Sequence, residues 1–163
     1  IVIVDYGLGN LGSIKNMLKK IGVRADVTDD HDKILEADKL ILPGVGAFDD
    51  GMKNLDSKGL IKILNQKVIQ EKTPILGICL GMQLMTEGSD EGKLPGLGWI
   101  EGSAKKFSSQ NNGEKIRIPH MGWNILKPSN GSENTDVVTY SYTTKNECDS
   151  NAKPVKLVLN FTF

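Results

Sequence analysis

Apolar and polar positions along the first part of the chain follow two periods. Residues 11–21 and 47–72 place apolar side chains at helical spacing, and the second stretch is interrupted near Ser57-Lys58-Gly59. In residues 47–72 an apolar stripe suited to core packing comprises Leu60, Ile61, Leu64, Val68 and Ile69. Strand-like segments flank these helices at residues 1–5, 23–28, 39–42 and 75–78. Such alternation predicts an α/β fold: an open, mostly parallel sheet with helices on both faces.

From Gly96 onward the pattern changes to short strand-like pieces separated by Gly, Ser and Asn. These pieces occupy residues 98–102, 105–107, 116–119 and 123–126. They predict a small antiparallel β addition on one flank of the sheet. Residues 128–163 diverge further, with polar loops around two strand-like segments, 137–142 and 155–163. At 163 residues we expect one domain spanning 1–163.

Composition narrows the class of protein. Twenty basic and twenty acidic residues cancel, so no net field recruits nucleic acid or an anionic membrane. No apolar run approaches the roughly 20 residues that span a bilayer, and Ile1–Val4 has no basic lead-in of a signal peptide. The two cysteines, Cys79 and Cys148, could form a disulfide, but nothing else indicates secretion. We therefore expect a cytoplasmic protein without nucleic-acid or membrane partners.

The most informative stretch surrounds Cys79. A buried strand runs into this cysteine, glycines stand two positions before and after it, and a helix-compatible segment follows. Small residues at these positions permit a sharp strand-to-helix turn, which holds a nucleophile at a helix N-terminus. There, free N–H groups lower the pKa of a thiol. The alternative is a small buried hydrophobe, the common fate of a free cysteine; Gly77 and Gly81 favour the nucleophile.

Two other glycine-rich turns follow predicted strands. Pro43-Gly44-Val45-Gly46 can turn its backbone N–H groups outward as a nest for an anion or oxyanion, or can be an ordinary connection. Gly7-Leu8-Gly9-Asn10 lacks a suitably placed ribose-binding acid, which favours a structural turn over a nucleotide site.

The two histidines are candidates for acid–base or metal chemistry. His31 lies in Asp29-Asp30-His31-Asp32, where a solvated turn is favoured over a metal site because adjacent residues rarely converge on one ion. His120 could serve as a general base for Cys79. We expect neither a metal nor a cofactor.

Three motifs resemble one known family. Gly77-Ile78-Cys79-Leu80-Gly81-Met82-Gln83 resembles the nucleophile motif of class I (triad) glutamine amidotransferases. Asp5-Tyr6-Gly7-Leu8-Gly9-Asn10 and Pro119-His120-Met121-Gly122-Trp123-Asn124 resemble the glutaminase subunits of imidazole glycerol phosphate synthases. The resemblance extends from Ile1 to about Asn124.

The resemblance implies a glutaminase of histidine biosynthesis. It would hydrolyse L-glutamine through a Cys79 thioester and pass ammonia through a shielded route to a (β/α)₈ synthase subunit in a heterodimer. The oxyanion and substrate contacts it implies involve Gly44, Val45, Gly46, Leu80 and Gln83. It gives His120 a structural role near the subunit interface. Trp123 and Asn124 are candidate interface residues, and a buried anchor of the β addition is the alternative for Trp123.

One part of the family pattern is missing. The family carries its catalytic base and orienting acid in a His-Pro-Glu motif, and no such motif occurs here. We therefore expect the domain to be incomplete at its C-terminus and the 163-residue chain to be inactive in glutamine hydrolysis. Two other hypotheses stay open: a related glutaminase supplying a sugar-modifying synthase of surface-polysaccharide synthesis, and a non-catalytic subunit that only binds its partner.

Overall fold

The computed structural model describes residues 1–105, 110–111, 114–115, 126–128 and 140–142. The chain divides into two compact units, 1–106 and 107–163. The expectation of a single domain over 1–163 stays a prediction.

A four-stranded parallel sheet lies at the centre of the first unit. Its strands are β1 (Val2–Val4), β2 (Asp26–Thr28), β3 (Leu40–Leu42) and β4 (Ile75–Gly77), in the order β2-β1-β3-β4. Every pairing is parallel, with Ile3 opposite Val27 and Ile41 on either side. Each strand coincides with a strand-like segment of the sequence, trimmed by one to three residues at its ends.

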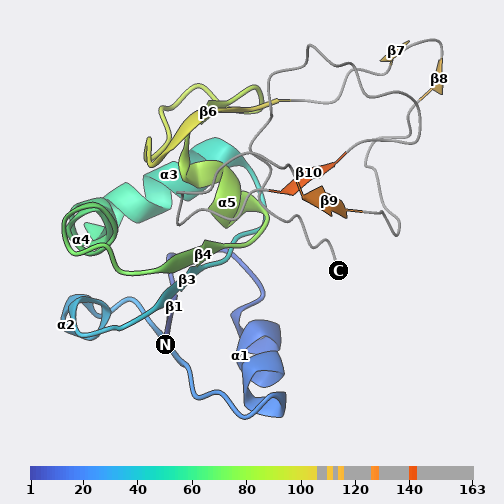
Figure 1. Ribbon diagram of the computed structural model, residues 1–163. Helices are drawn as coiled ribbons and strands as arrows, with labels where there is room; N and C mark the ends of the chain where they lie inside the picture. The colour runs from blue at the N-terminus through green and yellow to red at the C-terminus, as the bar shows by residue number, and fades with distance from the viewer. Residues whose placement is uncertain (106–109, 112–113, 116–125, 129–139, 143–163) are drawn as a thin grey trace. The chain divides into compact units, whose positions relative to one another are not determined.

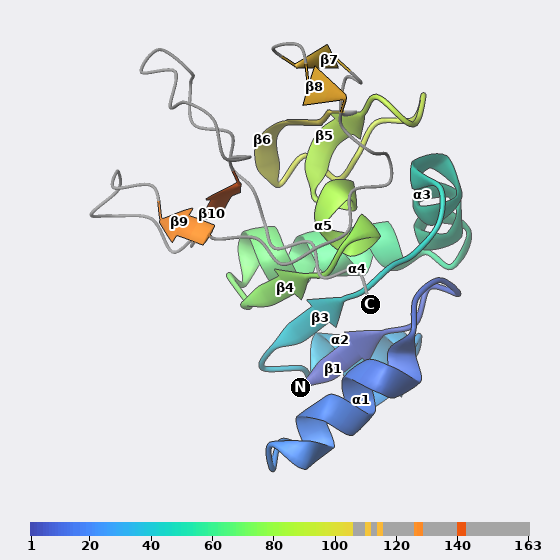
Figure 2. The same ribbon diagram turned by 90° about the vertical axis from the view of Figure 1, so that its right-hand side faces the viewer.

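Helices cover both faces of this sheet. They are α1 (Leu11–Lys20), α2 (His31–Leu35), α3 (Phe48–Ser57), α4 (Leu60–Asn65), a π-helix η1 (Gln66–Gln70) and α5 (Leu80–Leu84). In both ribbon views α1 lies on the opposite side of the strands from α2 (Figures 1 and 2). The predicted α/β class, with a mostly parallel sheet and helices on both faces, is therefore confirmed, and so is the interruption at Lys58 and Gly59.

The core lies between the sheet and the helices α2 to α5. Its fully buried side chains include Val4, Ile34, Leu42, Phe48, Leu55, Leu60, Leu64 and Leu84. Helix α1, by contrast, has no buried residue, and the residue that follows it, Ile21, is 69% exposed.

The π-helix changes which residues face the core after Asn65. Leu60 and Leu64 are buried as predicted, whereas Ile69 is 44% exposed, so its assignment to the core was wrong. A π-helix bonds residue i to i+5, as Glu71 N–H does to the Gln66 carbonyl, and this rotates the following side chains. Lys67 is buried instead, and its ammonium lies 2.7 Å from Glu71 Oε2. That hydrogen bond lowers the pKa of Glu71.

The acidic segment around His31 is a helix start rather than the predicted turn. The Asp30 carboxylate accepts hydrogen bonds from Asp32 N–H at 3.0 Å and from Lys33 N–H, which caps α2. His31 Nε2 donates to the Lys58 carbonyl, 2.8 Å away. No group of three or more potential metal ligands is found among the residues that the structure describes.

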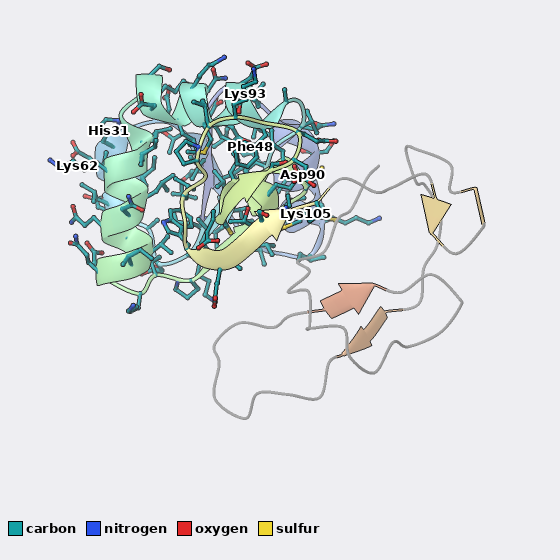
Figure 3. The ribbon with its side chains drawn as sticks, turned by 90° about the horizontal axis from the view of Figure 1, so that it is seen from above. His31, Phe48, Lys62, Asp90, Lys93 and Lys105 are labelled. Carbon is teal, nitrogen blue, oxygen red and sulfur yellow. The ribbon has the colours of Figure 1, made fainter. Side chains whose placement is uncertain are left out.

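A two-stranded ribbon follows α5. It pairs β5 (Thr86–Ser89) with β6 (Ile100–Ala104). At its end the Lys105 ammonium forms an ion pair with the Asp90 carboxylate, at 3.0 Å (Figure 3). The pair is parallel, so the antiparallel expectation was wrong for 98–102. The polar residues after α5 can form β5 because the hydrogen bonds between strands join backbone groups and do not depend on the side chains.

The described parts of the second unit form two short antiparallel pairs. These are β7 (Gln110–Asn111) with β8 (Glu114–Lys115), and β9 (Leu126–Pro128) with β10 (Tyr140–Tyr142). The antiparallel pairing agrees with the predicted addition, but β7 and β8 fall outside the pieces predicted for it, and β10 falls in the strand-like segment 137–142 of the divergent tail. The strand-like pieces at 116–119 and 155–163 lie outside the described residues. Within the described part of the chain, no helix is long and apolar enough to cross a membrane.

Candidate functional site

Three loops meet beyond the carboxyl ends of β1, β3 and β4. They are residues 6–10, 43–46 and 78–80. A Cβ on Gly9 would lie 3.5 Å from Gly44 Cα, and Leu80 N–H donates to the Gly44 carbonyl at 3.2 Å. Parallel strands end at one edge of their sheet, and this is where open α/β folds place their ligands. Segments far apart in the sequence therefore converge at one place.

Cys79 stands at the sharp turn between β4 and α5. Its φ is 53° and its ψ is −117°, a conformation that side-chain-bearing residues rarely adopt. Before it, Ile78 N–H donates to the Leu42 carbonyl and continues the sheet ladder; after it, the Cys79 carbonyl accepts the first bond of α5 from Met82 N–H. Cys79 is a partly exposed free thiol. The turn predicted from the glycine pair is present, and the bonds of Ile78 to Leu42 and of Leu80 to Gly44 hold its strained backbone at the sheet edge.

Gly77 and Gly81 are required by close backbone contacts on either side of the turn. A Cβ on Gly77 would lie 2.7 Å from Met82 Cα, and one on Gly81 would overlap the Leu42 carbonyl oxygen. Both neighbours are backbone atoms, which cannot move aside as a flexible side chain can. The glycines therefore let β4 turn into α5 while both stay packed on β3.

Replacing Gly81 by alanine is expected to lower the free energy of unfolding by about 3 kcal/mol or more, because the added methyl group separates the turn at residues 77–81, called the elbow below, from β3. Urea titration of the purified chain measures the change. Gly12→Ala is the matched control: nothing lies within 4 Å of its added Cβ, and alanine favours the helix there. Equal stabilities for Gly81→Ala and the parent would contradict the packing described.

The Pro43–Gly46 loop already contacts the elbow. Gly44 is buried, while Val45 is 56% exposed. The Gly44 carbonyl accepts the Leu80 N–H, so this predicted oxyanion donor is engaged within the protein in this state. Gly46 has a φ of +118°. The loop thus lies where an oxyanion nest would be, with a carbonyl turned toward the position that an oxyanion would take.

Sequence reasoning missed one residue of this site, Tyr6. Its side chain is fully buried, and its hydroxyl lies against Gly44, on the side where a Cβ would stand. That hydroxyl has no hydrogen-bond partner among the residues that the structure describes. Burial, and then the nearby charge of Cys79, raise the pKa of Tyr6 far above its ordinary range. A tyrosine directly after a buried strand and before a glycine turn was the available signal.

The other predicted site residues fall into two groups. Gln83 is half-buried on α5, one turn after Cys79, and its N–H donates to the Cys79 carbonyl. His120, Trp123 and Asn124 lie outside the described residues, as does Cys148. The structure therefore brings Gly44, Leu80 and Cys79 together and leaves the interface predictions as predictions.

Comparison with known proteins identifies relatives of the chain. Residues 2–158 match the family model of class-I glutamine amidotransferases. An imidazole glycerol phosphate synthase subunit HisH 2 from Methanococcus maripaludis is 61% identical over 127 residues, which is 78% of this chain and 61% of that protein. The HisH 2 subunit of Pseudomonas aeruginosa is 45% identical over 128 residues, 78% of this chain and 62% of its own length. The HisH subunit of Bdellovibrio bacteriovorus is 48% identical over 128 residues, 78% and 63% respectively.

A solved structure supports the fold. A crystal structure titled as a glutamine amidotransferase superposes with a TM-score of 0.55 at 18% identity, over 78% of this chain and 63% of that one. The chain spans about 61% of the length of its Methanococcus maripaludis relative and similar shares of the other two.

Proposed function

The chain belongs to the class-I glutamine amidotransferase family, and on that premise we propose that it is the glutaminase part of an imidazole glycerol phosphate synthase. In this proposal it releases ammonia from L-glutamine for histidine biosynthesis in the cytoplasm, where thiols stay reduced. The observation that carries the proposal is the strained Cys79 elbow beside the Pro43–Gly46 loop. The names of the three relatives support the histidine pathway over a surface-polysaccharide pathway.

The proposed chemistry begins at the Cys79 sulfur. The thiolate attacks the side-chain amide carbon of glutamine and forms a tetrahedral intermediate with a negatively charged oxygen. The carbon–nitrogen bond then breaks, the nitrogen takes a proton and leaves as ammonia, and a glutamyl thioester remains. Water hydrolyses that thioester to glutamate and restores the thiol. Gln83 and Gly46 help to seat the glutamine.

Stabilising the oxyanion requires one rearrangement of the observed loop. The Leu80 N–H serves the oxyanion only after the Gly44 carbonyl has turned away from it. Rotating the peptide between Gly44 and Val45 does this and turns the Val45 N–H inward, because carbonyl and N–H point to opposite sides of a peptide plane. The exposure of Val45 leaves room for this rotation. Each donor of this kind contributes about 3 kcal/mol to transition-state stabilisation.

The proposal predicts selective labelling of Cys79. A chloroketone analogue of glutamine should modify this thiol at least about a hundredfold faster than iodoacetamide does, once each rate is divided by the rate of the same reagent with a free thiol in solution. The reason is that substrate contacts orient the carbonyl of the chloroketone. Mass spectrometry locates the label, and L-glutamine should protect against it. Cys148→Ala is the matched control and should label like the parent. Equal rates for both reagents, without protection by glutamine, would indicate a subunit that only binds its partner.

Ammonia must reach its acceptor before it is protonated in bulk water. We propose that the partner is a synthase subunit of (β/α)₈ type, bound in a heterodimer that channels ammonia, with lyase chemistry on the synthase side. Trp123 and Asn124 are the candidate contact residues. The relatives' description as synthase subunits supports such a partner.

A further inference from the structure

The Tyr6 hydroxyl is a buried polar atom that the resting structure leaves unused. Within the described residues it is the buried side-chain oxygen or nitrogen without a hydrogen-bond partner. Leaving such a group unpaired is destabilising, and native structures seldom do so without a reason. Phenylalanine would fill the same space without this cost. The hydroxyl is therefore expected to find its partner in another state of the protein.

The neighbouring backbone supplies a group that needs a partner in another state. The Gly44 carbonyl now accepts the Leu80 N–H at 3.2 Å. When that N–H turns to an oxyanion, the buried carbonyl loses its donor and must find a new one. The Tyr6 hydroxyl lies directly against Gly44, which has no Cβ to separate the two.

We propose that Tyr6 is a positioning residue, whose hydroxyl donates to the Gly44 carbonyl once the loop has turned into its oxyanion-binding state. This inference rests on the proposed function and deepens it. One hydrogen bond, from Leu80 to Gly44, is exchanged for another, from Tyr6 to Gly44, so turning the loop leaves no backbone group unpaired. The raised pKa of Tyr6 keeps the hydroxyl protonated, and thus a donor, at every pH at which the thiolate reacts.

The distinguishing feature of this role is that Tyr6→Phe has opposite effects on two states. In the resting state the substitution removes an unpaired oxygen, so the protein should unfold at the same or a higher urea concentration. In the turned state it removes the donor, so chloroketone labelling of Cys79 should slow by about tenfold. The pH dependence of iodoacetamide labelling should not shift, because in this proposal the Tyr6 hydroxyl donates to the Gly44 carbonyl and not to the Cys79 sulfur.

The experiment measures both labelling rates and urea unfolding for the 163-residue chain, for Tyr6→Phe and for Ile34→Val. Ile34→Val removes a buried methyl group of the same core and should leave the ratio of labelling rates unchanged. Replacing Tyr6 with para-aminophenylalanine, which keeps a donor at the same ring position, should restore part of the chloroketone rate.

Each other result would overturn the inference in its own way. Parental chloroketone labelling of Tyr6→Phe would show that the hydroxyl is not needed. A shifted pH profile for iodoacetamide would assign the hydroxyl to the Cys79 thiol instead. A Tyr6→Phe chain that fails to fold would show that the hydroxyl already has a partner. Absence of chloroketone selectivity in the parent chain would overturn the proposed function itself, whatever Tyr6 does.

Discussion

Replacing Cys79 by alanine in the full-length protein, assayed with the synthase partner that we propose, is expected to abolish glutamine-dependent product formation. The substitution removes the only atom that forms the thioester, and loss of a nucleophile that acts with its base typically costs about 10⁶ in rate. Synthesis driven by added ammonium salt should persist, since it bypasses the thiol. Steady-state rates with each nitrogen source measure the difference. Glutamine-dependent turnover near the parental rate would refute the assignment of Cys79.

Urea unfolding of the Cys79 variants shows whether a loss of activity comes from a disturbed fold at the elbow. Cys79→Ala keeps a side chain at a φ of 53°, so it should unfold at nearly the parental urea concentration. Cys79→Gly relieves the strained backbone conformation and should be more stable than Cys79→Ala by about 1 kcal/mol. A gain of this size would show that the strained turn persists in solution. Both variants should be equally inactive, which separates the chemistry from the fold.

The 163-residue chain by itself is expected to hydrolyse glutamine slower by about 10²–10⁴ than a complete glutaminase, while its thiol still reacts with alkylating reagents. The leaving nitrogen needs a proton, and a positioned histidine normally supplies it. The two histidines here are His31, which donates to the Lys58 carbonyl, and His120. Glutamate release measured by a coupled assay gives the rate.

Imidazole provides a sharp check on this reasoning. As a small general base in solution, it should accelerate glutamate release by the chain in proportion to its concentration, and His31→Ala should not change the rate. Release at about 1–10³ s⁻¹ without imidazole would contradict the prediction. If that activity then disappeared in His120→Ala, His120 would be the base.

The elements of the first unit were predictable because their side-chain patterns reflect local physics. The strands β1 and β3 are short apolar runs buried in the core, and α3 and α4 present apolar faces of helical period. The strand before Cys79 was expected to be buried as well, but Leu76 in β4 is 49% exposed. The elbow was also predictable, since Gly77 and Gly81 have a steric purpose that follows from the turn alone.

Other features depended on contacts that no local pattern records. Within the π-helix η1, Lys67 is buried and Ile69 is exposed, because i+5 bonding changes the angle between successive side chains around the helix axis. The helix start at His31 had a local signal that the sequence analysis did not use, since Asp30 caps α2 through N–H groups two and three residues later. Only the bond from the His31 ring to the Lys58 carbonyl depends on contacts across the fold.

The sequence by itself determined the fold class and the glycines that let the turn at Cys79 form. The glycines depend on neighbours within a few residues, and the fold class depends on the order in which such local patterns follow one another. Tertiary structure alone decided that the Leu80 N–H is held by the Gly44 carbonyl and that the Tyr6 hydroxyl lies unpaired beside it. These facts depend on the register of β1, β3 and β4, which places three loop ends together in space. A hydrogen bond depends on distances of a few tenths of an ångström, and only packing sets such distances.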